Sequence, residues 1–244
     1  MRVIVCLDYN EMSMVGARFV SSQLTLKPDS VLGLATGLTP VGMYNILSDM
    51  NKKGEIDFSK VKSFNLDEYY KIAPDNEQSY HYFMEKNLFS KVNIKRENTH
   101  ILDGLSENPE EECERFDKLI QEKGGIDLQI LGIGRNGHIG FNEPDKELYS
   151  NTHLTPLTQS TIEANSVFFE SEDEMPKSAL TMGMSSILKS KRIIIMANGE
   201  SKKDAVARLL SGKISTDLPA SLLNIHPDVI LICDKAAYSS VNNK

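Results

Sequence analysis

Short apolar runs alternate with longer segments of helical periodicity along almost the whole chain, and this alternation limits the fold more than any other feature. Strands separated by helices pair in parallel, because a crossover helix returns the chain to the same end of the sheet. A parallel sheet is covered on both faces, as expected for runs such as residues 128–133, LQILGI. The sequence therefore predicts an α/β fold, with a mostly parallel sheet and helices on both faces in a modified Rossmann-like arrangement.

The positions of the elements follow from these periodicities. Strands are predicted at residues 2–7, 30–35, 61–66, 100–102, 128–133, 192–197 and 229–233. Helices are predicted at residues 11–24, 41–50, 79–89, 109–123, 160–169, 178–188 and 200–210. No repeat, low-complexity tract or obvious linker interrupts the series, so we predict a single domain over residues 1–244.

Charge and cysteine content exclude several classes of protein. The formal net charge is −7 and there is no Lys/Arg-rich run, which argues against nucleic acid as a partner. Cys6, Cys113 and Cys233 are widely separated and form no CxxC pair, so neither a disulfide framework nor a zinc site is indicated. The N-terminal sequence reaches acidic residues too early for a signal peptide, and no apolar run approaches membrane-spanning length. We therefore expect a cytoplasmic protein with no membrane partner.

The stretch of residues 126–144, IDLQILGIGRNGHIGFNEP, combines a buried strand with a glycine-rich loop. Glycine lets the backbone turn tightly and approach a ligand closely. An imidazole and a carboxylate on such a loop are typical of an active site, whereas a lone histidine would more simply be a solvated turn residue. The density of glycine and polar residues favours the active site. The residues concerned are Gly132, Gly134, Gly137, Gly140, Asn136, His138, Asn142 and Glu143.

The same glycines spell GxGxxG, the fingerprint of a dinucleotide-binding loop. That fingerprint needs a helix that begins at the third glycine and an acidic residue about 20 residues later. Gly140 and Pro144 oppose such a helix, and residues 151–156 contain no acidic side chain. A dinucleotide-dependent oxidoreductase is therefore only a distant alternative, and we expect no cofactor.

A second polar loop, Thr36-Gly37-Leu38-Thr39-Pro40, joins a predicted strand to a predicted helix. Free backbone N–H groups at a helix N-terminus favour an anion, and the loop lacks the lysine and the length of a P-loop. We predict a phosphate-binding loop. The simpler alternative is that Thr39 only caps the helix.

Asp67 follows the third predicted strand, beside Glu68. A neighbouring carboxylate raises the pKa of an acid, which suits a general base, although an exposed acidic turn or helix-capping residues would give the same sequence. Ligands bind at the carboxyl ends of parallel strands, so the three polar segments are expected to converge on one crevice. Together they indicate proton transfer on a small phosphorylated metabolite without a metal ion.

Six segments, in this order and over nearly the whole chain, resemble the glucosamine-6-phosphate deaminase family, also called the glucosamine/galactosamine-6-phosphate isomerase family. The combination of GHIGFNEP with FNLDEY is specific to it. The segments are LATGLTP at 34–40, FNLDEY at 64–69, LGIGRNGHIGFNEP at 131–144, ANSVFF at 164–169, ALTMGMSSIL at 179–188 and NGESKKDAV at 198–206.

This resemblance implies a hydrolase of amino-sugar catabolism that converts glucosamine 6-phosphate and water into fructose 6-phosphate and ammonium. By analogy, His138 opens the pyranose ring, Glu143 orients and tunes its imidazole, and Asn136 holds the imidazole in place. Asp67 then takes the proton from C2 and delivers it to C1, which gives an enolamine and leads to loss of ammonia. The resemblance also implies that residues 145–184 form a helical lid over the site.

Phosphate in this family is bound by the backbone of the loop formed here by Thr36, Gly37, Leu38 and Thr39, by a lysine that corresponds to Lys202, and by an arginine. This chain has Val167 at the arginine position, and Leu38 crowds the loop. Either Arg135 or Lys203 compensates, or the substrate is bound weakly, or it is another amino-sugar phosphate such as galactosamine 6-phosphate.

A catalytically weak, sugar-phosphate-binding regulator is a further alternative. Family members activated by N-acetylglucosamine 6-phosphate use basic residues just after the FNEP loop, where this chain has His153 and Thr155. We therefore expect no such activation. The sequence leaves open whether the protein is a monomer or a homo-oligomer.

Overall fold

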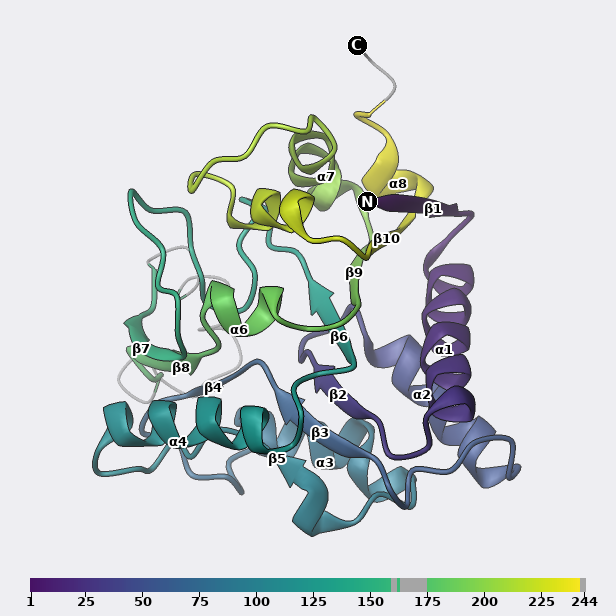
Figure 1. The fold of residues 1–244 in the computed structure, drawn as a ribbon. Helices are drawn as coiled ribbons and strands as arrows, with labels where there is room; N and C mark the ends of the chain where they lie inside the picture. Colours follow the sequence, from purple (N-terminus) through teal and green to yellow (C-terminus); the bar gives the residue numbers. More distant parts are fainter. Residues whose placement is uncertain (159–161, 163–174, 242–244) are drawn as a thin grey trace.

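A seven-stranded parallel sheet forms the centre of the molecule, with strand order β1-β10-β9-β6-β2-β3-β5 (Figure 1). The computed structural model describes residues 1–158, 162 and 175–241. The strands lie within two residues of the predicted positions, since each is defined by its own apolar run. Their bounds are β1 (Arg2–Cys6), β2 (Val31–Leu34), β3 (Lys62–Asn65), β5 (Thr99–His100), β6 (Leu128–Gly132), β9 (Ile193–Ala197) and β10 (Val229–Asp234).

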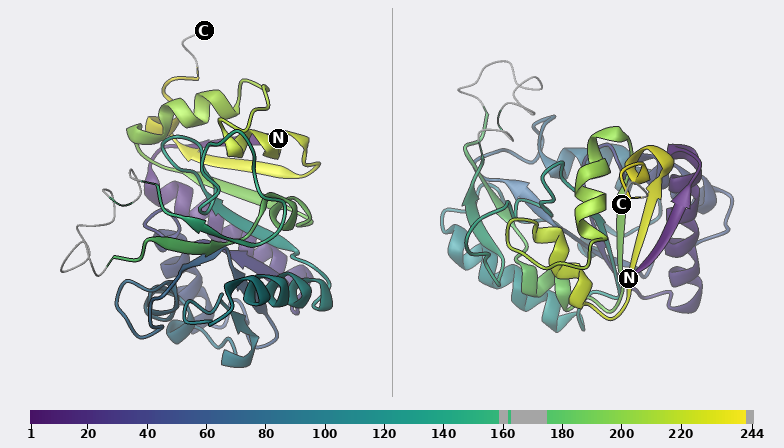
Figure 2. Two further views of the ribbon diagram at one scale, coloured as in Figure 1. Left: turned by 90° about the vertical axis from the view of Figure 1, so that its left-hand side faces the viewer. Right: turned by 90° about the horizontal axis from the view of Figure 1, so that it is seen from above.

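Helices cover both faces of the sheet, as predicted (Figures 1 and 2). One face packs against α1 (Tyr9–Leu26), α2 (Val41–Lys52) and α3 (Tyr80–Asn87). The other packs against α4 (Pro109–Glu122), α6 (Met184–Leu188), α7 (Lys203–Leu209) and α8 (Lys235–Tyr238). Short 3₁₀ helices lie at η1 (Phe89–Lys91), η2 (Arg96–Asn98), η4 (Glu200–Lys202) and η5 (Pro219–Ile225).

Strand β9 contains no polar residue because both of its faces are covered. Ile193, Ile195 and Ala197 face the core under α4 and α7, whereas Ile194 and Met196 face the core under α1 and α2. All five are buried. Because successive side chains point to opposite faces, a strand covered on both sides must be apolar throughout.

A second, antiparallel sheet corrects two predictions. It consists of β4 (Asp67–Tyr69), β8 (Ser178–Thr181) and β7 (His153–Pro156), in the order β4-β8-β7. Asp67 was expected in a loop but lies on a strand. Residues 178–188 were expected to be one helix, but β8 comes first and only Met184–Leu188 is helical. Pairing on both sides of β8 overrides its local helical preference, because context decides strand formation more than propensity does.

Gly183 separates β8 from α6. A Cβ atom there would lie 2.1 Å from the carbonyl oxygen of Asn151, so the backbone passes too close to the neighbouring loop to continue a helix with side chains. The described parts of the expected helical lid, residues 145–158 and 175–184, contain β7 and β8 rather than long helices. The predicted helix at 160–169 and Val167 lie outside the described residues.

No helix in the described part of the chain is both long enough and apolar enough to cross a membrane.

Candidate active site

The sheet topology brings distant loops to one edge. Strands β9, β6, β2 and β3 are neighbours and run parallel, so their carboxyl ends lie side by side. The segments that leave these ends contain the phosphate-type loop, the FNLDEY motif, the glycine-rich loop and the NGESKK motif. This is the crevice position expected for a ligand of an open parallel sheet.

Glycines shape the loop after β6 around the side chain of His138. The N–H of Gly134 donates to the His138 carbonyl oxygen at 2.9 Å, which closes the loop. A Cβ atom on Gly134 would lie 2.4 Å from the His138 ring, and one on Gly137 would lie 2.0 Å from Leu218. The glycines therefore allow close packing around an imidazole. No helix begins at Gly137, so the structure lacks the helix that a dinucleotide fingerprint requires.

Three polar side chains of this loop form a chain of contacts. Asn136 Nδ2 donates to Glu143 Oε2 at 2.7 Å, and Glu143 Oε1 lies 3.1 Å from His138 Nδ1, although the ring is not aligned for a linear hydrogen bond. Asn136 Oδ1 accepts from the backbone N–H of His138 at 3.2 Å. Asn136 therefore acts on the imidazole through these two contacts. It fixes the backbone of His138 and the carboxylate that faces the ring.

The His138 side chain is 31% exposed, while its Nδ1 is buried against Glu143. The exposed part of the ring therefore includes the opposite edge, which carries Nε2. A carboxylate on one ring nitrogen leaves the other for proton exchange with a substrate.

Asp67 lies beside the far end of the same loop. Gly140 has a positive φ of 59°, and a Cβ atom there would lie 2.8 Å from Thr181 Oγ1 and 3.2 Å from Asp67 Oδ2. Thr181 is the cross-strand partner of Asp67, and its hydroxyl accepts the N–H of Phe141 at 3.1 Å. The small sheet thus docks the glycine-rich loop against Asp67. Sequence analysis missed Thr181 because it lies in a segment predicted to be helical.

Burial sets the chemistry of Asp67. Its side chain is only 6% exposed and receives no hydrogen bond from the described residues. Burial, together with the smaller effect of the negative charge of Glu68, raises the pKa of Asp67 to about 8. The predicted effect of the neighbouring carboxylate is confirmed, and the alternative of an exposed acidic turn is wrong.

The loop after β2 is tied to the loop after β9. Thr39 Oγ1 donates to Asn198 Oδ1 at 2.8 Å, and the N–H of the following Gly199 donates to the Asp234 carboxylate at 2.9 Å. The N-cap residue of α2 is Pro40, so the alternative that Thr39 only caps this helix is wrong. Sequence analysis missed Asn198, which follows β9, and Asp234, the last residue of β10; both hold this loop.

The same loop exposes its backbone. Gly37 has a positive φ of 84° with open space around it, and the Leu38 side chain is 82% exposed. Leu38 therefore does not crowd the loop. Thr36 is half-buried beside it.

Two cations, Arg135 and Lys202, lie on the segments that follow the neighbouring strands β6 and β9. Burial lowers the pKa of Lys202, and the positive charge of nearby Arg135 lowers it further. In contrast, Lys203 Nζ forms an ion pair with Glu200 Oε1 at 2.8 Å. Of the two residues that could replace the missing arginine, Lys203 is therefore engaged by Glu200, whereas the positive charge of Arg135 acts on Lys202. Two cations that act on each other in this way favour an anion between them.

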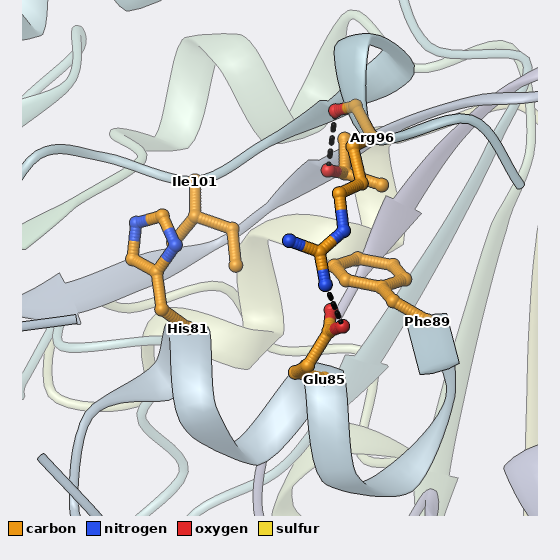
Figure 3. A pocket seen from close by; sticks show the side chains of 6 residues that line it. His81, Glu85, Phe89, Arg96 and Ile101 are labelled. Carbon is orange, nitrogen blue, oxygen red and sulfur yellow. Dashed lines mark hydrogen bonds and ion pairs between the residues drawn. The ribbon is translucent and has the colours of Figure 1, made fainter. Parts of the chain in front are cut away.

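A small pocket of about 170 Å³ lies elsewhere, between α3 and β5 (Figure 3). It is lined by His81, Glu85, Phe89, Arg96, Thr99 and Ile101, and Arg96 pairs with Glu85 at 2.7 Å. None of the predicted site residues lines it, so it is separate from the crevice described above. His81 is partly buried on α3. In the described part of the chain, no three His, Cys, Asp or Glu side chains are grouped so that they could hold a metal ion.

Comparison with known proteins gives a consistent result. The family described as glucosamine-6-phosphate isomerases/6-phosphogluconolactonase matches residues 17–231. The glucosamine-6-phosphate deaminase of Halothermothrix orenii is 56% identical over 239 residues, which cover 98% of this chain and 99% of the relative. That of Clostridioides difficile is 53% identical over 244 residues, covering 100% and 98%.

Solved structures agree. A monomeric glucosamine-6-phosphate deaminase matches with a TM-score of 0.95 and 43% identity, covering 98% of this chain and 100% of the other. The 6-phosphogluconolactonase of Thermotoga maritima shares the fold, with a TM-score of 0.76 and 21% identity over 96% of this chain and 99% of the other. The chain therefore belongs to the family of glucosamine-6-phosphate isomerases and 6-phosphogluconolactonases.

Proposed function

We propose that the protein is a glucosamine-6-phosphate deaminase, which converts glucosamine 6-phosphate and water into fructose 6-phosphate and ammonium. The observation that carries the proposal is the buried Asp67 carboxylate next to the loop of His138 and Glu143. The reaction needs one group that exchanges protons with oxygen and another that removes a proton from carbon. The deaminases from two other organisms named above support the choice of substrate.

Ring opening is the role of His138. Its imidazole transfers a proton from the anomeric hydroxyl to the ring oxygen, so that the C1–O5 bond breaks and C1 becomes an aldehyde. Glu143 faces the buried Nδ1 and Asn136 holds Glu143, which fixes the ring for proton exchange through its other nitrogen.

Asp67 acts on the open chain. Its carboxylate removes the proton from C2 to give an enolamine and returns a proton to C1, which leaves an imine at C2. Water adds to this imine and ammonia leaves, so fructose 6-phosphate is formed. A base with a pKa of about 8 suits this step, because abstraction from carbon is faster with a more basic carboxylate.

The phosphate group is assigned to the opposite side of the crevice. The open backbone of Thr36, Gly37, Leu38 and Thr39 offers N–H groups, and Lys202 with Arg135 offers two positive charges. The chain has Val167 where the family has an arginine, and a lost charge-assisted hydrogen bond is worth about 1.5–3 kcal/mol. We infer that Arg135 supplies this contact.

Ammonia release, coupled to detection of fructose 6-phosphate, tests the proposal with glucosamine 6-phosphate titrated over a wide range. We expect saturable release that added N-acetylglucosamine 6-phosphate does not change. Release from galactosamine 6-phosphate alone would reassign the substrate. Binding without release from either sugar would indicate a regulator, and NADH fluorescence enhancement would indicate the dinucleotide alternative.

Replacement of Arg135 tests the phosphate assignment. Arg135→Ala is expected to raise the KM for glucosamine 6-phosphate roughly 10-fold or more with kcat nearly unchanged, because a phosphate contact acts on bound substrate and transition state alike. Lys203→Ala is the matched control, since it removes a nearby cation that is paired with Glu200. If adding Val167→Arg to Arg135→Ala restores a low KM, Arg135 has taken over the phosphate contact of the missing arginine. Equal KM values in Arg135→Ala and Lys203→Ala would contradict this assignment.

A further inference from the structure

Glu68 is a buried carboxylate to which the proposed reaction assigns no role. Its side chain is only 1% exposed, directly after Asp67 on β4. Glu68 Oε1 accepts the backbone N–H groups of Tyr69 at 2.8 Å and Tyr80 at 2.9 Å, and Oε2 accepts that of His81 at 3.0 Å. Burial of a carboxylate is costly unless it is hydrogen-bonded in this way. Three backbone N–H groups donate to the Glu68 carboxylate, which indicates that this buried acid has a role in the protein.

Two of these donors belong to the first turn of α3. The first N–H groups of a helix have no partner within the helix. Here the N–H groups of Tyr80 and His81 are satisfied by Glu68, and that of Tyr82 by Ser79 Oγ at 3.0 Å. The positive end of the helix favours an ionised Glu68. Glu68 therefore caps a helix that comes later in the chain and binds it to β4.

Asp67 and Glu68 point to opposite faces of the small sheet, because side chains alternate along a strand. The Asp67 face meets Gly140 and Thr181 of the active site, and the Glu68 face meets α3. On the Glu68 face, Gly104 packs against the Glu68 side chain: a Cβ atom on Gly104 would lie 3.4 Å from Glu68 Cγ. Glu68 is therefore separated from the substrate by the backbone that carries Asp67.

We propose that Glu68 is a positioning residue of the reaction: clamped by the N-terminus of α3, it holds β4 in place behind Asp67 and sets a fixed negative charge beside it. This inference rests on the proposed deaminase function. Among the described residues no cation forms an ion pair with either carboxylate. No ion pair in the described part of the chain therefore neutralises the charge of Glu68, which makes Asp67 a stronger base.

The order of ionisation agrees with this role. Burial raises the pKa of Glu68 to about 7, while its three N–H donors oppose the rise. The pKa of Asp67 is raised to about 8 and Asp67 accepts no hydrogen bond from the described residues, so the donors favour the ionised form of Glu68 over that of Asp67. Burial also raises the pKa of Tyr69 to about 12 and that of Tyr80 well above its usual range, and it lowers the pKa of His81. Further titratable groups on packed elements are Tyr82, Glu85 and Lys86 on α3, His153 on β7, Asp103 beside Gly104, and His138 and Glu143 on the loop that contains Gly140.

Glu68→Gln tests the proposal, because it keeps the size of the side chain and removes the charge. We expect KM within about twofold of wild type and a plateau kcat reduced roughly 10-fold. The limb of the kcat/KM profile that reports ionisation of Asp67 should move to lower pH by about one unit. The difference in kcat/KM between wild type and Glu68→Gln should therefore become smaller as the pH falls. A profile that coincides with wild type, with kcat within about twofold, would overturn the proposal.

Two further variants separate charge from helix capping. Ser79→Ala removes the neighbouring cap of α3 and should lower Tm while leaving the pH limb in place. Glu68→Asp keeps the charge but is one methylene too short to reach α3, so we expect a reduced kcat with the limb near its wild-type position. Should Glu68→Gln not fold, Glu68→Asp decides the question, because a limb shifted to lower pH in that variant would contradict a role for the charge.

A direct titration distinguishes this inference from the proposed function. Carbon-13 NMR of the Asp67 carboxyl carbon, assigned by its absence in Asp67→Asn, reports ionisation without any turnover. We expect its midpoint to be higher in wild type than in Glu68→Gln. Equal midpoints would overturn the inference even in an active enzyme. A shifted midpoint in a protein that releases no ammonia would leave the inference standing and overturn only the proposed function.

Discussion

Asp67→Asn is expected to lower kcat for ammonia release roughly 10³-fold, the usual contribution of a general base, while the KM for glucosamine 6-phosphate changes little. Asparagine matches the shape of the buried side chain but cannot accept a proton from carbon. The variant should still bind substrate, measured by calorimetry. A regulator that only binds sugar phosphates would respond to them equally well with either residue, so the same variant separates an enzyme from a sensor.

As the pH rises, ionisation of Asp67 should change catalysis and stability in opposite directions. Catalysis needs the ionised carboxylate, so wild-type kcat/KM should rise as the pH increases through about 8. Stability should change in the other direction. A carboxyl whose pKa is raised by folding contributes stability below its unfolded value of 3.8, and this contribution is lost as the pH rises through about 8. Thermal unfolding should show Asp67→Asn to be more stable than wild type above this pH. Equal melting temperatures there would contradict the burial argument.

His138→Gln is expected to reduce kcat/KM for glucosamine 6-phosphate by about 10²–10³-fold, because the pyranose ring would then open only at its spontaneous rate. Glutamine cannot transfer a proton between the anomeric hydroxyl and the ring oxygen. Ammonia release measured in the steady state would give the loss directly.

A reduced, open-chain analogue of the substrate provides the control for this second variant. The analogue, an amino-hexitol 6-phosphate, needs no ring opening, so its Kd should be the same for wild type and His138→Gln. Weaker binding of the analogue would mean that His138 holds substrate rather than opening it. Glu143→Gln should give a smaller loss than His138→Gln, since Glu143 acts on the imidazole and not on the sugar.

Local patterns were sufficient for the main sheet and its helices. Strand β9 is apolar at every position because both of its faces are covered, and any segment of this composition between two helices would be predicted in the same way. The glycine-rich loop was also predictable, since Gly134 and Gly137 leave space that a side chain would fill. These features depend on residues that are close together in the sequence.

The small sheet could not be predicted, because its three strands come from distant parts of the chain. Strand β8 has the local character of a helix and becomes a strand only between β4 and β7. The same pairing places Asp67 opposite Thr181 and buries it. The sequence could therefore suggest Asp67 as a base, but it predicted a loop position.

By itself, the sequence determined the α/β class and the single domain, and it suggested Asp67, His138 and Glu143 as the catalytic set, because periodicity and motif spacing are local properties. Only the tertiary structure decided which atoms meet. It placed Asn136 on Glu143 and on the backbone of His138, Lys203 on Glu200, and Glu68 on the first turn of α3. The physical reason is that desolvation, charge–charge interaction and hydrogen bonding depend on distances in space, which are fixed only when segments far apart in the chain pack together.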